Sequence, residues 1–173
     1  MAFSPDNKWL VIGSADYTAS LWDLANLAKQ DPAEQPNPEP VFVFSGHTNW
    51  ISALAISTDS RWLVTASGDS TARRWDLWDL KKPPSATTKP LVAAPLIFHG
   101  HQGQIRAVAI SSDDHWLVTG DDDGTARRWD LAGFEDTYPI VLCGHRQDRG
   151  TIRTVAISPQ SHWLVTGSED GTA

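Results

Sequence analysis

The stretch GHQGQIRAVAISSDDHWLVTGDDDGTARRWDL, residues 100–131, decides the fold because the chain repeats it. Residues 46–77 match it at 20 of 32 positions by direct comparison. Residues 144–173 form a third copy that lacks the Trp-Asp pair, and residues 2–24 form a fourth that lacks the Gly-His pair. A self-similar unit with a period of about 50 residues indicates a repeat architecture, in which each unit packs against its neighbours.

Each unit has the pattern of short β-strands separated by turns. In the unit quoted above, residues 105–111, 116–120 and 125–131 are rich in strand-forming residues, and the segments SSDDH and DDDGT between them are rich in turn formers. Both alternating sides of the first strand are apolar, which predicts a sheet that is covered on both faces. A fourth strand is expected before each Gly-His, in residues 40–44, 95–98 and 139–143.

Three motifs recur at fixed places in the units: Gly-His at the start, Asp-x-Thr in a turn and Trp-Asp at the end. Together they resemble the motifs of the WD-repeat β-propellers. The resemblance implies an all-β fold, a β-propeller fragment built from four-stranded antiparallel blades. The likeness among the units is similar to that in long bacterial WD-repeat arrays, which are often joined to kinase, ATPase or protease modules.

The whole chain is predicted to form one partial propeller of about 3.5 blades. The expected blades are residues 1–46 with an incomplete start, 47–100, 101–144, and a truncated 145–173. Since propellers close with roughly 4 to 8 blades, we expect this to be part of a longer propeller, or to self-associate through its end blades. Two proline-containing inserts, residues 25–40 and 78–95, are expected to stay outside the sheets.

The resemblance also implies a buried hydrogen-bond network in each blade, formed by the His of Gly-His, a strand Thr, the turn Asp and the Trp of Trp-Asp. The corresponding residues are His47, Thr65, Asp69 and Trp75, then His101, Thr119, Asp123 and Trp129, and finally His145, Thr166 and Asp170. In this arrangement every buried polar group finds a partner. The role of the network is therefore structural.

A hydroxyl, a histidine and an aspartate are also the components of a nucleophilic triad. Because the set recurs in every unit, whereas catalysis needs one site, we interpret it as part of the scaffold. Residues 121–124, Asp-Asp-Asp-Gly, faintly resemble a calcium loop but lack the closing bidentate glutamate, so a tight turn is favoured. No cofactor, metal or catalytic residue is predicted.

Two arginines and the tryptophans of the Trp-Leu pairs occupy positions between blades. Arg74 and Arg128 stand where the first unit has Leu21. A buried charge needs a partner, so we expect an ion pair or a chain that extends to the surface, with a ligand-binding role as the alternative. The Trp-Leu tryptophans are expected to pack between blades, with an exposed aromatic band as the alternative.

Candidate partner-binding residues are those at which the units differ on the face that carries the Gly-His and Asp-x-Thr turns. They are Trp50, Gly68, Gln104, Arg106, Asp122, Arg153 and Glu169. Trp50 has no counterpart, since Gln104 and Thr151 hold its position in the other units. Because tryptophan often dominates interfaces, Trp50 is a candidate partner anchor, with a merely local contact as the alternative.

Composition narrows the class of partner. The net charge of −7 disfavours nucleic acid as a partner, because proteins that bind it more often have a basic surface. The sequence shows no signal peptide and no apolar run of the roughly 18 residues that a membrane helix needs. The single cysteine, Cys143, excludes an intrachain disulfide and suits a reducing compartment. We therefore predict a cytoplasmic protein that binds neither nucleic acid nor membrane.

Three functions are compatible with these observations. The leading prediction is a non-catalytic scaffold that presents loop residues on rigid blades to a protein or peptide. The alternative is a regulatory or sensor segment of a larger bacterial signalling enzyme, whose kinase, ATPase or protease module lies outside this chain. An enzyme in its own right is disfavoured because no phosphate loop, metal-ligand spacing or unshared nucleophile-base pair stands out.

Overall fold

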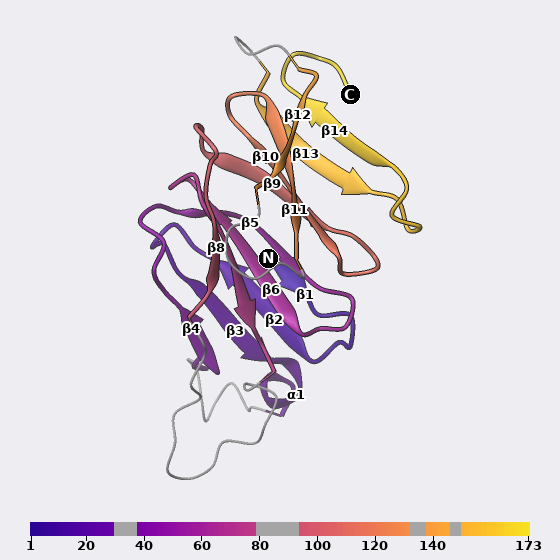
Figure 1. Ribbon diagram of the computed structural model, residues 1–173. Coiled ribbons are helices and arrows are strands. Elements are labelled where there is room, and N and C mark those ends of the chain that lie inside the picture. Colours follow the sequence, from indigo (N-terminus) through magenta and orange to yellow (C-terminus); the bar gives the residue numbers. More distant parts are fainter. Residues whose placement is uncertain (30–37, 79–93, 132–137, 146–149) are drawn as a thin grey trace.

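The computed structural model describes residues 1–29, 38–78, 94–131, 138–145 and 150–173, and these form almost only β-strands (Figure 1). The first sheet contains β1 (Ala2–Phe3), β2 (Trp9–Gly13), β3 (Ala19–Asp23) and β4 (Phe42–Phe44). The second contains β5 (Ile51–Ile56), β6 (Trp62–Ser67), β7 (Ala72–Asp76) and β8 (Leu96–Phe98). The third contains β9 (Ile105–Ile110), β10 (Trp116–Asp121), β11 (Thr125–Asp130) and β12 (Ile140–Cys143). A two-stranded sheet of β13 (Ile152–Ile157) and β14 (Leu164–Ser168) follows.

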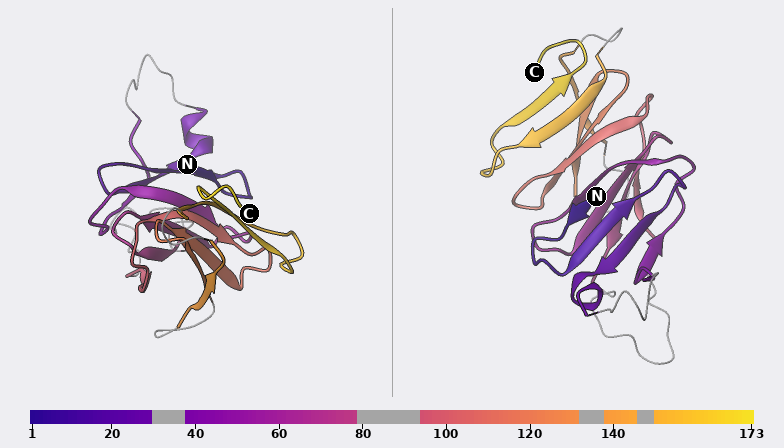
Figure 2. Two further views of the ribbon diagram at one scale, coloured as in Figure 1. Left: turned by 90° about the horizontal axis from the view of Figure 1, so that it is seen from above. Right: turned by 180° about the vertical axis from the view of Figure 1, so that it is seen from behind.

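The sheets follow one another in a curved row, from indigo to yellow in Figure 1, and the view from behind in Figure 2 shows the same order. Within each sheet the strands pair antiparallel in chain order. The first strands of neighbouring sheets contact each other, β5 with β9 and β9 with β13. These strands therefore line the inner side of the row, and the fourth strands lie at its outer side. The predicted all-β fold with antiparallel propeller blades is confirmed.

The hydrophobic core lies between the sheets. Leu21 and Val11 of the first sheet pack in one cluster with Leu63 and Trp75 of the second. A second cluster joins residues of the second and third sheets, namely Val64, Ala66, Ala72, Phe98, Ile105, Leu117, Trp129 and Leu131. Each sheet thus depends on its neighbour for burial, which explains why its strands are apolar on both sides.

The turn between the first and second strands has the same construction in successive units. Ser57 Oγ donates to Asp59 Oδ1 at 2.6 Å, and the backbone N–H of Trp62 donates to Ser57 Oγ at 2.8 Å. A bond between sheets is added at the same end, where Thr58 Oγ1 donates to Asp114 Oδ2 at 2.6 Å. These bonds fix the turns locally and tie the second sheet to the third.

The first insert contains one secondary-structure element that was not predicted. It opens with a short helix, α1 (Leu24–Leu27), which lies beside the first sheet in Figure 1. Asp23 explains the helix, because its Oδ1 accepts hydrogen bonds from the backbone N–H groups of Ala25 and Asn26 at 2.8 and 3.2 Å. Of the two predicted inserts, residues 30–37 and 79–93 lie outside the described residues.

Two ends of the sheets can be distinguished. One end, which we call the Gly-His face, carries the Gly-His connections between sheets and the turns between second and third strands. Backbone bonds hold these loops together, as in the Gly68 N–H to Trp50 C=O bond of 3.0 Å and the Asp122 N–H to Gln104 C=O bond of 3.0 Å. The opposite end carries α1 and the Ser-Asp turns.

Candidate functional site

The second sheet contains a complete polar network. His47 Nδ1 lies 2.7 Å from Asp69 Oδ2, and His47 Nε2 lies 2.9 Å from Thr65 Oγ1. Trp75 Nε1–H donates to the same Thr65 oxygen at 3.0 Å. With Nδ1–H donating to the carboxylate, Nε2 accepts the threonine proton and the threonine oxygen accepts the indole proton. All the buried groups are then satisfied, and the chain of bonds locks the ring orientations.

The charges of this network follow from its burial. Burial lowers the pKa of His47 from 6.5, more than the nearby Asp69 raises it, so the imidazole is neutral. Burial by itself raises the pKa of Asp69, but hydrogen bonds from Thr71, the Thr48 N–H and His47 outweigh it and lower that pKa to about 2. The network therefore consists of a neutral imidazole and a charged carboxylate over the whole neutral pH range.

This network makes the stability of the protein dependent on pH. Because the pKa of His47 is lower in the folded chain than its value of 6.5 elsewhere, the unfolded chain gains a proton first as the pH falls below that value. Asp69 adds a second loss below about pH 4, since its folded pKa of about 2 lies below 3.8. We expect the urea midpoint, followed by circular dichroism, to be lower at pH 5 than at pH 7.5.

The matched control for this prediction is His47→Gln, which removes the titrating imidazole. Its urea midpoint should change less between the two pH values than that of the unmodified chain, because the remaining titrating groups are common to both proteins. An equal change in both proteins would show that His47 does not carry the pH dependence.

In the third sheet the prediction of Asp123 as the histidine partner is wrong. His101 Nδ1 lies 2.6 Å from Oδ2 of Asp121, and its Nε2 lies 2.6 Å from Thr119 Oγ1, which also accepts from Trp129 Nε1–H at 2.9 Å. Asp121 ends β10, where the second sheet has Ser67, and is fully buried against the imidazole. A carboxylate at this strand position reaches the ring directly, so the turn aspartate is displaced from that role.

The displaced Asp123 is hydrogen-bonded to Asp121, and the pKa values of the two carboxyls are shifted in opposite directions. Burial raises the pKa of Asp123, and the hydrogen bond to the Asp121 carboxylate raises it further. Burial also acts to raise the pKa of Asp121, but the bonds from His101 and Asp123 outweigh it, so that pKa is lowered. Two adjacent carboxyls cannot both ionise without cost, so Asp121 is the one that ionises at the lower pH.

The remaining units carry partial networks. In the two-stranded sheet His145 Nε2 lies 2.7 Å from Thr166 Oγ1, and His145 Nδ1 lies 3.3 Å from Asp170 Oδ2. In the first sheet Ile12 replaces the threonine, and the indole N–H of Trp22 is buried without a hydrogen-bond partner among the described residues. The missing hydroxyl that the sequence shows thus has a direct structural consequence.

The inter-blade arginines are stacked on the Trp-Leu tryptophans. The guanidinium of Arg74 lies 4.2 Å from the ring centre of Trp62, and that of Arg128 lies 4.1 Å from the ring centre of Trp116. Burial lowers the pKa of Arg74, which indicates that the stack is partly removed from water. Arg74 also donates to the backbone oxygen of Leu131 in the third sheet. Stacking on tryptophan and a bond to backbone thus take the place of the expected ion pair.

The structure brings most of the candidate partner-binding residues together on the Gly-His face. Arg106 Nε and Nη2 bond to the two carboxylate oxygens of Asp122 at 2.7 and 2.9 Å. One sheet further, Arg153 Nε and Nη2 bond to Glu169 Oε1 at 2.8 and 2.6 Å. The hydrogen bond to Asp122 raises the pKa of Arg106, and the charge of Glu169 adds to this effect, which indicates that the two ion pairs lie near each other.

Trp50, which directly precedes β5 of the second sheet, lies on the same face next to Arg106. The Arg106 guanidinium lies 5.9 Å from its ring centre, and the indole is 38% exposed. Gly68 makes room for it, because a Cβ atom at that position would approach Trp50 Cε2 to 3.2 Å. We call the set of Trp50, Arg106, Asp122, Arg153 and Glu169 the turn strip.

Two features of the turn strip were not predicted. Asn49 Oδ1 accepts from the Trp50 N–H at 2.9 Å, and its Nδ2 donates to the Gly68 oxygen at 3.2 Å, so it holds the loop that carries the indole. Its position between Gly-His and a unique tryptophan was a usable signal. Gln104 contributes differently from the prediction, since its Oε1 is buried and makes no hydrogen bond among the described residues.

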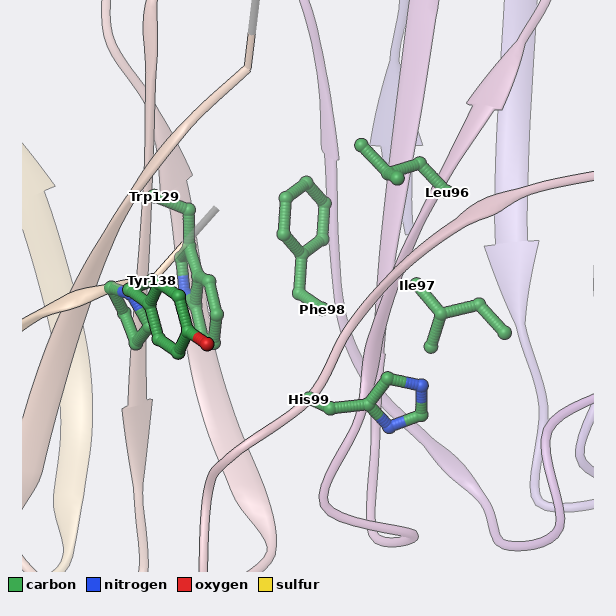
Figure 3. A pocket seen from close by; sticks show the side chains of 7 residues that line it. Leu96, Ile97, Phe98, His99, Trp129 and Tyr138 are labelled. Carbon is green, nitrogen blue, oxygen red and sulfur yellow. The ribbon is translucent and has the colours of Figure 1, made fainter. Parts of the chain in front are cut away.

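A small groove lies away from the turn strip, between the second and third sheets. It has a volume of about 250 Å³ and is lined by Leu96, Ile97, Phe98, His99, Trp129, Tyr138 and Pro139. Figure 3 shows the Phe98 ring between Leu96 and the rings of Trp129 and Tyr138. The Phe98 and Trp129 ring centres are 5.3 Å apart, so the floor of the groove is an aromatic contact between sheets.

Two further findings concern other classes of site. Across the described ranges, no group of three or more His, Cys, Asp or Glu side chains is arranged to hold a metal ion. Within the same part of the chain, no helix has the length and apolar character needed to cross a bilayer.

The fold and its repeated networks define a class of protein built from WD blades. A family model described as WD domain, G-beta repeat, matches residues 1–23, 38–76, 94–130 and 137–173. Since these segments make up most of the chain, the protein belongs to the WD40 repeat family.

Several proteins are similar to this chain. It is 32% identical over 132 residues to the guanine nucleotide-binding protein subunit beta of Arabidopsis thaliana, covering 73% of this chain and 29% of that protein. It is 29% identical over 129 residues to human striatin-3, covering 75% and 16%. It is 26% identical over 141 residues to the target of rapamycin complex subunit wat1 of Schizosaccharomyces pombe, covering 82% and 38%. The chain thus spans well under half of the length of each. These relatives are eukaryotic, and the likeness to bacterial arrays stays a prediction.

Proposed function

We propose that the chain is a non-catalytic interaction module that binds a protein or peptide through the turn strip. The observation that supports this most strongly is the strip itself, an exposed tryptophan followed by two arginine–carboxylate ion pairs on three consecutive sheets. The module consists of the four repeat units with the boundaries predicted above, residues 1–46, 47–100, 101–144 and 145–173.

The turn strip has the properties of a preorganised binding surface. The side chains of Arg106 and Asp122 are 26% and 30% exposed, and those of Arg153 and Glu169 are 53% and 48% exposed. Two hydrogen bonds to its carboxylate partner hold each arginine in one geometry and leave its outer atoms accessible to a partner. Less side-chain entropy is then lost on binding than with free arginines. An apolar or aromatic partner residue would pack on Trp50, flanked by groups that bond to the ion pairs.

The buried networks support the non-catalytic part of the proposal. The distances around His47 are those of a nucleophilic triad, but Thr65 is only 1% exposed and His47 only 7%. A substrate has no access to such a hydroxyl, whose oxygen already accepts the Trp75 indole proton. The same set recurs in the next sheet, which fits a structural role. We propose no cofactor, and a cytoplasmic location remains a prediction.

The proposal is tested by selecting binding peptides from a displayed random library and measuring their affinities for single variants. Trp50→Ala should weaken the selected peptides at least tenfold, because the anchoring indole is lost. Trp78→Ala is the matched control, since Trp78 is 57% exposed and lies beyond the end of β7, away from the Gly-His face. Peptides that lose affinity equally with both variants, or with neither, would argue against the turn strip as the binding surface.

A further inference from the structure

Arg106 lies at the centre of the turn strip, between Trp50 and Asp122. Its guanidinium is 5.9 Å from the ring centre of Trp50, and its Nε and Nη2 bond to the carboxylate of Asp122 at 2.7 and 2.9 Å. Arg106 belongs to β9, which contacts β5 on one side and β13 on the other. The side chain of Arg106 thus has a sheet on either side of it and is still 26% exposed.

The Arg106 guanidinium keeps donors that Asp122 does not use. A guanidinium carries more N–H groups than one carboxylate can accept, and here only its Nε and Nη2 side is engaged. Among the described residues Nη1 makes no hydrogen bond, and it is not one of the buried polar atoms that lack a partner. It therefore faces solvent. Together with the second N–H of Nη2 it forms an outer edge with parallel donors, which fits both oxygens of a carboxylate or phosphate group.

The Asp122 carboxylate holds this outer edge in one orientation. The Asp122 N–H bonds to the Gln104 C=O at 3.0 Å, and the loop packs closely on Gly103, where a Cβ atom would lie 3.2 Å from Asp122 Cβ. Since backbone contacts fix the acceptor, the plane of the guanidinium is fixed with it. The outer edge of Arg106 is thus oriented before a partner arrives, which lowers the entropy lost on binding.

An apolar surface borders the outer edge on the side of the second sheet. There Ser52 and Gly68 hold the positions that the ion-pair residues occupy in the third sheet. The Ser52 hydroxyl is turned inward and bonds to backbone oxygens of the second and third sheets at 3.0 and 2.5 Å. The Trp50 indole, which is 38% exposed, therefore lies directly beside the Arg106 guanidinium.

The neighbouring charges decide which anion fits the outer edge. The hydrogen bond to Asp122 raises the pKa of Arg106, and the charge of Glu169 adds to this effect, so two carboxylates lie near the guanidinium. They repel a phosphate group, which carries about two negative charges, more strongly than a carboxylate, which carries one. A cationic partner residue is repelled by the guanidinium itself. The outer edge is therefore matched to a single carboxylate.

We propose that the turn strip recognises a protein segment in which an aspartate or glutamate adjoins an aromatic or large apolar residue, an inference that rests on the function proposed above. The carboxylate accepts both hydrogen bonds from the outer edge of Arg106, and the apolar side chain packs on Trp50. Arg106 then stands between two carboxylates, that of Asp122 and that of the partner. Charge-assisted pairing of this kind fixes the orientation of the segment as well as adding affinity.

The test pans three displayed peptide libraries on the full chain. In each library a phenylalanine is followed by one fixed residue, which is glutamate, glutamine or lysine, and the flanking positions are random. Sequencing should show the glutamate library enriched about tenfold over the glutamine library, because a hydrogen bond to a charged group contributes more than one to a neutral group. The lysine library should be depleted.

Variants of the chain identify the group that reads the carboxylate. Arg106→Lys keeps the charge but loses the parallel donors, so it should remove most of the preference for glutamate. Asp122→Asn should increase this preference, because a competing negative charge is removed while the guanidinium remains. Arg61→Gln is the matched control, since the Arg61 side chain is 48% exposed at the opposite end of the sheets, and it should leave the preference unchanged.

Several results would overturn this proposal. One is enrichment of the glutamine or lysine library, and another is a glutamate preference that survives Arg106→Lys. Equal weakening by Arg106→Lys and Asp122→Asn would also overturn it, since the ion pair would then only support the loop. Equal enrichment of all three libraries that is lost with Trp50→Ala would reject the acidic motif and leave the turn strip as the binding surface. No enrichment of any library would reject both.

Discussion

Replacing Trp129 with alanine is expected to lower the free energy of unfolding by about 3 to 5 kcal/mol, the usual cost of removing a large buried aromatic side chain. Trp129 is 2% exposed and belongs to the core cluster between the second and third sheets. Its indole also donates to Thr119 and contacts Phe98 of the preceding sheet. The variant therefore loses a polar network and an inter-sheet contact together.

Urea unfolding followed by circular dichroism measures this effect, and two variants make it interpretable. Trp129→Phe keeps a ring but removes the N–H group, so it should cost less, about 1 to 3 kcal/mol. Trp78→Ala should change the free energy of unfolding by no more than about 0.5 kcal/mol, because Trp78 is largely exposed. Similar losses from Trp78→Ala and Trp129→Ala would contradict the assignment of the core.

The second large effect is a difference in the loss of stability that alanine substitutions at Asp121 and at Asp123 cause. Asp121→Ala is expected to lower the free energy of unfolding by about 3 kcal/mol, because it leaves the buried His101 imidazole without its partner. Asp123→Ala should cost less than about 1 kcal/mol, since Asp123 bonds to Asp121 and to the N–H and side chain of Thr125 within its own turn, and does not hold the imidazole. The order of the two effects is the reverse of what the turn motif alone predicts.

The second sheet provides an internal control for this asymmetry. There the turn aspartate itself bonds to the imidazole, so Asp69→Ala should resemble Asp121→Ala in its cost. The measurement is the urea midpoint of each variant at neutral pH. Should Asp123→Ala prove as destabilising as Asp69→Ala, the turn aspartate would carry the network in both sheets, and the assignment of Asp121 would be wrong.

The fold was predictable because the sequence repeats itself. Each Trp-Leu pair marks a strand with apolar residues on both sides, and strands of this kind can be buried only between neighbouring sheets. The short helix α1 was not predictable from this pattern, because the pattern marks the Asp of Trp-Asp as the end of a strand and does not indicate the N-cap that Asp23 forms.

The presence of the histidine networks was predictable from the motifs, but the aspartate partner of each histidine was not. The second sheet offers one aspartate in its turn, so the pairing of His47 with Asp69 follows from the motif. Residues 121–123 offer three aspartates in succession, and which one faces His101 depends on where β10 ends. The sequence contained a signal, an aspartate in the place of Ser67, but the motif outweighed it.

The turn strip was also predictable only in part. Its residues were predicted one by one because the units differ at them, but their pairing was not. Arg106 and Asp122 are 16 positions apart and meet only because β9 and β10 are adjacent antiparallel strands of one sheet. The contact of Arg106 with Trp50 crosses from one sheet to the next, and it depends on how the sheets are packed. Such contacts require the tertiary structure.

The central claim is that the Gly-His face is where the chain binds its partner. Hydrogen-deuterium exchange with a selected peptide tests it most directly. We predict that the peptide slows exchange in the backbone of residues 48–50, 68–70, 104–106, 122–124 and 168–170, at one end of three consecutive sheets. Slowed exchange confined to the Ser-Asp turns at the opposite end, around Ser57 and Ser111, would contradict the claim.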